Sequence, residues 1–250
     1  MIQFQNVTKS YGPNMVLDHI DLEISGGELV TIVGPSGAGK STLMHALIGD
    51  IPIDEGAILV DGYEITAFSS ATLQEYRRRV GMVFQDYKLL EKKTVYENVA
   101  FALEVCGWSD EDIRERVYEV LELVGMLDHE GKFPAQLAGG EGQRTAIARA
   151  MVHNPRLLIA DEPTGNLDYQ NTQEILKILN TINEGGATVL LATHNRELVD
   201  QLQKRVIVIN EGRVISDREH SGYEVRMEST IEVSPEGEVG EIEIFEIMEL

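Results

Sequence analysis

The residues best suited to chemistry form a glycine-rich segment that ends in a lysine and two hydroxyls. This segment follows an apolar strand predicted over residues 28–33 and precedes a helix predicted from Lys40 to Ile48. Between a strand and a helix, such a loop holds phosphates with its backbone amides while its lysine reaches the β and γ phosphates. A glycine-rich turn with an incidental lysine is the alternative. The residues predicted to bind a nucleoside triphosphate are Gly34, Pro35, Ser36, Gly37, Ala38, Gly39, Lys40, Ser41 and Thr42.

Two carboxylates follow the apolar strand predicted over residues 157–160. Asp161 ends this strand, where a charge is costly unless it has a function, and we expect it to hold Mg²⁺ together with the Ser41 hydroxyl. Glu162 comes next and is the candidate general base that activates the attacking water. The alternative interpretation is a helix cap, with Pro163 at an early helical position.

Three further side chains are candidates because of where they stand beside predicted strands and turns. Gln85 and His194 follow strands predicted over residues 80–84 and 188–192, and ligands bind at the carboxyl ends of strands in open α/β sheets. We expect Gln85 to meet Mg²⁺ or the attacking water, and His194 to contact the γ-phosphate. Tyr11 is a candidate platform for stacking adenine, with a simple turn tyrosine as the alternative.

Composition limits the class of protein. The hydrophobic content of 43% and the charged content of 25% are ordinary for a globular chain. Cys106 is the only cysteine, so an intrachain disulfide is impossible. A net charge of −21 argues against binding nucleic acid or a bare anionic membrane. No apolar run approaches a membrane span, so we expect no direct membrane insertion, and any membrane association runs through a protein partner.

The spacing of apolar residues predicts an α/β fold interrupted by a block of helices. Alternation over residues 2–7 and 17–24 predicts an antiparallel pair. A helical pattern runs from about Thr94 to Met151, and another helix is expected over residues 175–182. Continuous apolar runs of strand length suit a parallel sheet covered on both faces, and they occur at residues 157–160, 188–192 and 206–209.

The C-terminal segment, residues 217–250, differs from the rest of the chain. It has eleven acidic residues against Arg218 and Arg226, a net charge of −9. Apolar and acidic residues alternate over residues 223–233 and 239–247, which predicts a possible β-hairpin. A solvated acidic tail is the alternative interpretation.

A second glycine-rich segment, L-A-G-G-E-G-Q-R at residues 137–144, narrows the class of protein. Together with the phosphate loop, A-D-E-P-T-G-N-L-D at 160–168 and His194, it resembles the motif set of ABC-type ATPases. The resemblance implies ATP, Mg²⁺ and a homodimer in the ATP-bound state. It assigns Ala138, Gly139, Gly140, Glu141 and Asp168 to a surface that completes the neighbouring copy's ATP site.

The same resemblance implies a domain organisation. It covers residues 1–216 and implies a P-loop NTPase core with a parallel central sheet, a small antiparallel β subdomain and a helical signature subdomain. The core would comprise about residues 1–90 and 153–216, the helical subdomain about residues 91–152, and the C-terminal extension residues 217–250.

A narrower resemblance concerns the segment around and after Gln85. V-G-M-V-F-Q-D-Y-K-L-L at 80–90 and T-V-Y-E-N-V-A-F-A-L-E-V at 94–105 look like the FtsE family of cell-division ATPases. This implies an FtsX-like integral membrane subunit docked near Gln85, and a cytoplasmic protein peripheral at the inner face of the cell membrane. Lipoprotein-release and drug-export ATPases share A-D-E-P-T-G-N-L-D and stay as alternatives.

Two departures from the family pattern concern the signature. The family usually has serine at position 138 and glutamine at 142, where this chain has Ala138 and Gly142. The serine hydroxyl normally contacts the γ-phosphate across the dimer, so we expect a weakened contact. A weakly hydrolysing ATP switch is therefore a further alternative. Val95, Val99 and Leu103 form an apolar helical face that either borders the docking groove or packs in the core.

Overall fold

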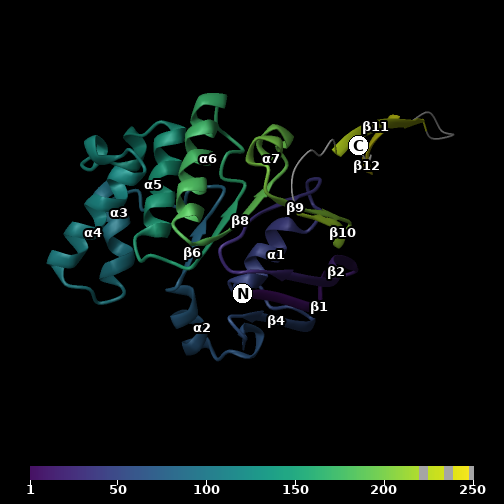
Figure 1. Cartoon of the computed structure of the whole chain (residues 1–250), viewed down its shortest axis with the longest axis horizontal. Coiled ribbons are helices and arrows are strands. Elements are labelled where there is room, and N and C mark those ends of the chain that lie inside the picture. The colour runs from purple at the N-terminus through teal and green to yellow at the C-terminus, as the bar shows by residue number, and fades with distance from the viewer. Residues whose placement is uncertain (220–224, 234–238, 248–250) are drawn as a thin grey trace.

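A six-stranded sheet forms the centre of the protein (Figure 1). The computed structural model describes residues 1–219, 225–233 and 239–247. β3 pairs in parallel with β8 and β9, β7 pairs in parallel with β6 and β8, and β10 is antiparallel to β9. In sheet order the strands are β10 (Arg213–Arg218), β9 (Arg205–Asn210), β3 (Leu29–Val33), β8 (Thr188–Thr193), β7 (Leu157–Asp161) and β6 (Val80–Val83).

A smaller antiparallel sheet packs beside the central one. Its strands in order are β2 (Asn14–Ile24), β1 (Ile2–Tyr11), β4 (Glu55–Val60) and β5 (Tyr63–Glu64). The helices are α1 (Lys40–Leu47), α2 (Ser70–Arg77), α3 (Val95–Glu104), α4 (Asp110–Leu123), α5 (Gly139–Met151), α6 (Tyr169–Glu184) and α7 (Arg196–Leu202), with short 3₁₀ turns at Ile65–Ala67, Leu127–His129 and Pro134–Gln136.

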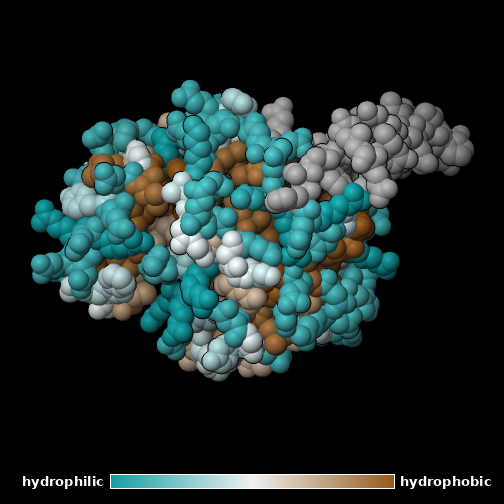
Figure 2. Space-filling model, in the orientation of Figure 1, coloured by the Kyte–Doolittle hydropathy of each residue, from teal (hydrophilic) through white to brown (hydrophobic). Residues whose placement is uncertain are grey.

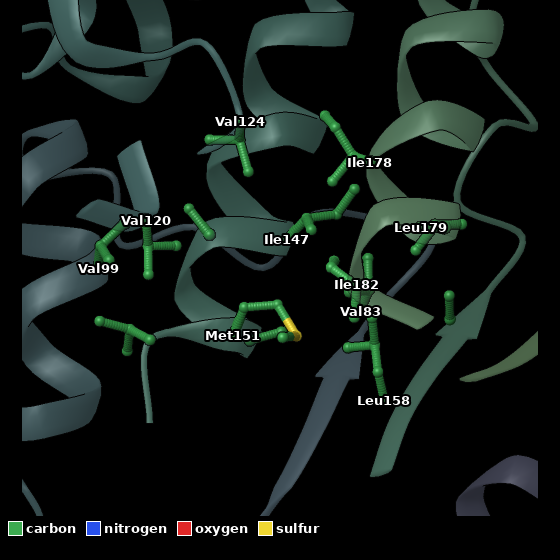
Figure 3. Packing of buried hydrophobic residues seen from close by; sticks show 14 of the residues in the cluster. Val83, Val99, Val120, Val124, Ile147, Met151, Leu158, Ile178, Leu179 and Ile182 are labelled. Atoms are coloured by element: carbon green, nitrogen blue, oxygen red, sulfur yellow. The ribbon is translucent and has the colours of Figure 1, made fainter. Parts of the chain in front are cut away.

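Hydrophobic cores cover both faces of the central sheet. Every residue of β7 and β8 is buried, as expected for parallel strands with helices or a second sheet on either side. On one face, Ile147 of α5 and Ile178 of α6 pack over Leu158 of β7 (Figure 3). On the other face, α1 and the antiparallel sheet form a second core. These observations confirm the predicted α/β fold with its parallel central sheet.

The block of helices between β6 and β7 resolves an open question about one apolar face. Val95, Val99 and Leu103 on α3 are all fully buried in the core that α3 shares with α4 and α5. Ordinary core packing is therefore the correct interpretation, and these three residues do not form a docking surface. The helix expected over residues 175–182 is also longer, because Asp168 caps its N-terminus and starts it at Tyr169.

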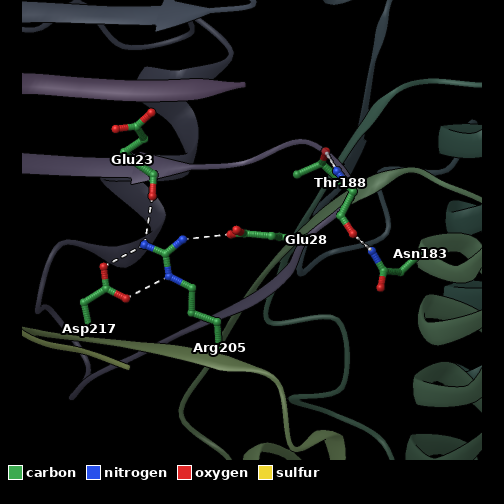
Figure 4. A network of polar contacts seen from close by, with 7 residues as sticks. Glu23, Glu28, Asn183, Thr188, Arg205 and Asp217 are labelled. Carbon is green, nitrogen blue, oxygen red and sulfur yellow. Dashed lines mark hydrogen bonds and ion pairs between the residues drawn. The ribbon is translucent and has the colours of Figure 1, made fainter. Parts of the chain in front are cut away.

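Arg205 on β9 links the edge strand β10 to Glu23 and Glu28, which precede β3 in the chain. Its guanidinium donates to Asp217 (2.8 and 2.7 Å), to Glu28 (2.7 Å) and to the Glu23 carbonyl (2.8 Å), as Figure 4 shows. Since Asp217 lies in β10, the boundary expected at residue 216 falls inside a strand. Because β10 ends at Arg218, a truncation that keeps this strand whole must come after that residue.

Two C-terminal strands, β11 (Val225–Val233) and β12 (Val239–Ile247), pair antiparallel with Val225 opposite Ile247. The expected turn at residues 234–238 lies outside the described residues. Hydrophilic residues cover most of the face of residues 1–219 seen in Figure 2, with separate hydrophobic patches between them. None of the helices in the described part of the chain combines the length and apolar character that a membrane span requires.

Candidate active site

A cleft of about 840 Å³ opens where the phosphate loop meets the carboxyl ends of the parallel strands. It brings together side chains from five separate segments of the sequence. Its lining residues are Tyr11, Val16, Pro35, Ser36, Gly37, Gly39, Lys40, Ser41, Thr42, Gln85, Glu162 and His194. Except for Val16, all of them are residues that the sequence predicts for nucleotide binding or hydrolysis.

The phosphate loop is packed too closely against its neighbours for most side chains. At Gly39 the backbone has φ = 105°, and a Cβ there would lie 2.5 Å from the Val16 carbonyl oxygen on β2. A Cβ at Gly34 would lie 2.0 Å from the Ile209 carbonyl oxygen on β9. Ala38 is buried behind the loop and accepts a backbone hydrogen bond from Gly212 (3.2 Å). The loop conformation is therefore held by two strands and by the turn before β10.

Lys40 is a buried cation at the start of α1. Its Nζ donates to the carbonyl oxygens of Gly34 (2.8 Å) and Pro35 (3.0 Å), and lies 3.9 Å from Glu162 Oε1. Burial lowers the pKa of Lys40, while the negative charges of Glu162 and Asp161 oppose that shift. The ammonium group is thus held inside the loop, where it can exchange carbonyl contacts for phosphate oxygens.

Ser41, which lines the cleft, is paired with the buried carboxylate of Asp161. The Ser41 hydroxyl donates to Asp161 Oδ1 at 3.0 Å. Burial raises the pKa of Asp161, and the hydrogen bond from Ser41 partly offsets this. A hydroxyl beside a carboxylate is a donor set that Mg²⁺ accepts together with substrate phosphates, so these residues fit the ion. Gln85 lies exposed on the same cleft and can add an amide oxygen.

Glu162 is held in a strained backbone conformation. Its φ of 48° lies in the left-handed region, which costs a non-glycine residue about 1–2 kcal/mol. A hydrogen bond from its N–H to the Ala192 carbonyl (2.9 Å) holds it there. Oε1 lies 3.0 Å from His194 Nδ1, and Oε2 is buried without a hydrogen-bond partner among the described residues. Glu162 lines the cleft, where a carboxylate can accept a proton from a bound water.

Two residues at the mouth of the cleft come from the antiparallel sheet. Tyr11 is half exposed at the end of β1, with Lys9 Nζ 5.5 Å from its ring centroid. Val16 on β2 also lines the cleft, and no sequence signal singled it out. Together they offer an aromatic and an apolar surface of the kind that a nucleotide base stacks on.

The signature segment, residues 137–144, lies apart from the phosphate cleft of its own chain. None of the described residues that line the cleft comes from residues 137–144. Ala138 caps α5 without a side-chain oxygen, and its N–H donates to Glu141 (2.9 Å), which lowers the pKa of Glu141. Ala138 and Gly139, at the start of α5, are exposed.

Asp168 packs beside the signature. It caps α6 by accepting from the Asn171 N–H (2.9 Å) and from Asn171 Nδ2 (2.7 Å), which lowers its pKa. Gly140 lies against the same asparagine, because a Cβ at Gly140 would be 1.9 Å from Asn171 Oδ1. The structure thus groups Asp168 with Ala138, Gly139, Gly140 and Glu141, apart from the phosphate cleft.

Comparisons with known proteins give consistent results. The ABC transporter family model matches residues 17–165. The chain is 48% identical over 224 residues to the cell division ATP-binding protein FtsE of Streptococcus pneumoniae, covering 89% of this chain and 97% of that protein. It is 45% identical to the methionine import ATP-binding protein MetN of Carboxydothermus hydrogenoformans, covering 87% of this chain and 66% of that protein.

Among solved structures, the chain resembles the ATP-binding cassette MJ0796, described as a dimer in a post-hydrolysis state bound to ADP and Pi. The TM-score is 0.82 at 34% identity, over 89% of this chain and 100% of the other.

Proposed function

The chain belongs to the ABC transporter family of ATPases, and from that premise we propose that it is the ATP-hydrolysing subunit of an FtsE-like membrane complex in cell division. Membership confirms the predicted ATPase activity, and the 48% identity to FtsE of Streptococcus pneumoniae confirms the predicted resemblance to FtsE. The observation that carries the catalytic part is the grouping of Lys40, Glu162 and His194 on one cleft, with Asp161 hydrogen-bonded to Ser41 of the same cleft. The cell-division role rests on the likeness to FtsE.

In this proposal each residue of the cleft has one task. Lys40 and the loop amides bind the β and γ phosphates of ATP, and Tyr11 stacks on the adenine. Ser41, Asp161 and Gln85 hold Mg²⁺, which when bound neutralises phosphate charge. Glu162 accepts the proton of the attacking water, and His194 orients Glu162 and reaches the γ-phosphate. General-base catalysis of this kind contributes roughly 10²–10⁴-fold in rate.

The signature supports a homodimer in the ATP-bound state. Ala138, Gly139 and Asp168 lie outside the phosphate cleft of their own chain and are exposed. Exposed amides at a helix N-terminus attract anions, so they are placed to meet a second copy's ATP. The related cassette MJ0796 is described as a dimer. Two copies would then enclose two ATP molecules between them.

An exposed apolar surface on the helical block supports a membrane partner. Phe101 and Val105 stand one turn apart on and just after α3 and are 40% and 48% exposed. Lys93 Nζ lies 5.6 Å from the Phe101 ring centroid. We propose that an FtsX-like integral membrane subunit docks here, which would place the protein at the inner face of the cell membrane. A transporter ATPase is the second candidate function, because MetN is 45% identical.

The catalytic proposal is tested with Glu162→Gln. We expect ATP binding to be retained, steady-state hydrolysis to fall by about 10²-fold or more, and an ATP-bound dimer to accumulate in sedimentation. Glu64→Gln, an exposed substitution on β5, is the matched control and should hydrolyse normally. Near-normal hydrolysis by Glu162→Gln would remove Glu162 from the mechanism.

The partner proposal is tested by co-purification with an FtsX-like protein. Phe101→Ser should weaken co-purification and leave the ATPase activity of the isolated protein unchanged. Tyr63→Ser removes a more exposed aromatic from β5 and should change neither. Equal retention of the partner by both variants would move the docking surface away from Phe101, and co-purification with a transporter subunit instead would favour the second candidate.

A further inference from the structure

Tyr87 lies between the cleft and the signature, and α5 holds it there. It follows Gln85 by two residues, and both Tyr87 and Lys88 have left-handed backbone conformations, with φ of 55° and 50°. Arg149 of α5 donates to the carbonyl oxygens of Tyr87 (2.8 Å) and Lys88 (2.6 Å). A planar guanidinium that binds two adjacent carbonyls fixes this strained segment onto the signature helix.

The ring of Tyr87 lies over the first turns of α5. A Cβ at Gly142 would be 3.1 and 3.2 Å from Cδ2 and Cε2 of the ring, which is tighter than ordinary packing. A Cβ at Gly139 would be 3.3 Å from the Tyr87 hydroxyl oxygen. A longer side chain at position 142 would displace the ring. The Tyr87 ring can therefore take this position because residue 142, one of the two departures from the family signature, is glycine.

The hydroxyl of Tyr87 is free to bind a ligand. It has no hydrogen-bond partner within the described residues, although its ring is half-buried. It lies beside the exposed N-terminal turn of α5, where Ala138 provides no hydroxyl. Burial raises the pKa of Tyr87, so the group keeps its proton at neutral pH and can donate a hydrogen bond.

We propose that Tyr87 replaces the missing signature hydroxyl, with its ring in the space left by Gly142 and its O–H donating to the γ-phosphate of the ATP bound by a second copy. This inference rests on the proposed homodimer. The two departures from the family signature then compensate for each other. Ala138 lacks the usual serine hydroxyl, and Gly142 leaves room for the Tyr87 ring, whose hydroxyl takes over that contact. Tyr87 belongs to the closing contact and not to the binding of ATP by the single chain.

The test is a double-mutant cycle in the Glu162→Gln background, with ATP-dependent dimerisation followed by sedimentation. Tyr87→Phe keeps the ring on Gly142 and removes only the hydroxyl, so we expect dimerisation about tenfold weaker and ATP affinity of the monomer unchanged. Ala138→Ser should restore dimerisation in the Tyr87→Phe variant and improve it far less when Tyr87 is present. Tyr63→Phe, on the exposed strand β5, is the control and should match the parent.

The possible results separate this inference from the function on which it rests. Normal dimerisation by Tyr87→Phe would overturn the inference, and so would additive effects of the two substitutions, because a hydroxyl that replaces another at one contact must couple to it. If the Glu162→Gln parent itself forms no dimer with ATP, the proposed homodimer fails, and this inference fails with it. Equal melting temperatures for Tyr87→Phe and the parent would show that lost folding is not the cause.

Discussion

The phosphate cleft and the signature segment hold their polar groups in opposite ways. In the cleft, Lys40, Asp161 and Glu162 are only 6%, 6% and 9% exposed. At the signature, Ala138 and Gly139 are exposed at the N-terminus of α5, and the Ala138 N–H is already bonded to Glu141. Buried charges are costly and persist where a ligand will pair with them, whereas exposed amides cost little until something covers them. The polar groups of the cleft are therefore placed within one chain, whereas the proposed function requires a second chain to cover the signature.

The largest effect should come from a methyl group in the phosphate loop. Gly39→Ala places a Cβ 2.5 Å from the Val16 carbonyl oxygen in a left-handed backbone, so the loop must move. We expect ATP affinity to fall by 100-fold or more and the protein to lose several kcal/mol of stability, on the order of other overpacked and strained sites. ATP titration and thermal unfolding measure both.

Gly37→Ala is the matched control for this substitution. Gly37 also has a left-handed backbone (φ = 82°), but a Cβ there would meet nothing within 4 Å. Backbone strain alone should cost about 1–2 kcal/mol of stability. If the two variants behave alike, close packing against β2 is not what holds the loop, and the contrast between a rigid cleft and an open signature weakens.

Removing the charge of Asp161 should lower activity and raise stability. Asp161→Asn is expected to remove Mg²⁺-dependent hydrolysis and to stabilise the nucleotide-free protein by about 0.5–2 kcal/mol, as substitutions at strained functional sites commonly do. Because burial raises the pKa of folded Asp161 above its ordinary 3.8, ionisation destabilises the folded state. The stability advantage of the variant should therefore be absent below that ordinary value and appear as pH rises through the folded pKa.

Chemical denaturation at several pH values measures this difference. The expected sign follows from the raised pKa, since the parent loses stability as Asp161 ionises and the variant does not. A variant that is less stable than the parent at neutral pH would show that the Ser41 hydrogen bond to Asp161 outweighs the cost of burial.

On the signature side, Gly140→Ala should damage the dimer and spare the cleft. Its Cβ would lie 1.9 Å from Asn171 Oδ1 and 3.0 Å from Asn171 Cβ, so either the Asn171 side chain must move or α5 and α6 must separate slightly. We expect a stability loss of about 1–3 kcal/mol, weaker ATP-driven dimerisation and unchanged ATP affinity of the monomer. A fall in ATP affinity would mean that the two regions are coupled within one chain.

Gly142→Ala is the milder counterpart on the same helix. Its Cβ would contact the Tyr87 ring at 3.1 Å, and a ring at the end of a flexible side chain can shift by a few tenths of an ångström. We expect a stability change of about 1 kcal/mol or less and a dimerisation defect smaller than that of Gly140→Ala. Sedimentation of both variants with ATP compares them directly, and the reverse order would contradict this account of the signature surface.

More of the cleft than of the signature surface could be predicted from the sequence. Gln85 and His194 follow apolar runs, and the carboxyl ends of parallel strands meet at one edge of a sheet, so their grouping with the phosphate loop follows from general rules. Val16 was missed because its contact with the cleft depends on how the antiparallel sheet packs against the loop. The role proposed for Tyr87 was missed because its position depends on the left-handed backbone of Tyr87 and Lys88, which no local sequence pattern predicts.

The helices show the same division between local and tertiary information. Apolar spacing placed Val95, Val99 and Leu103 on one face, but only the packing of α4 and α5 determines that this face is buried. The start of α6 was missed because its first turn has no apolar period, although Asp168 is a typical capping residue. Glu211 and Gly212, in the turn that supports the phosphate loop through Ala38, also gave no sequence signal of that role.

The smallest effect should come from removing the C-terminal extension, provided that the cut spares β10. Truncation after Glu219 keeps Asp217, whose carboxylate accepts two hydrogen bonds from Arg205 at 2.8 and 2.7 Å. ATP affinity and hydrolysis should then match the full chain, because every residue that lines the cleft lies before position 195.

Truncation after Ser216 also removes Asp217 and leaves Arg205 with Glu28 and the Glu23 carbonyl. Losing one partner of such a charge-assisted pair costs about 1–3 kcal/mol, so this shorter chain should unfold at lower denaturant concentration while retaining its ATP site. Equal stability of the two truncations would place the end of the ATPase domain back at residue 216, and loss of hydrolysis after the longer cut would give the extension a part in catalysis.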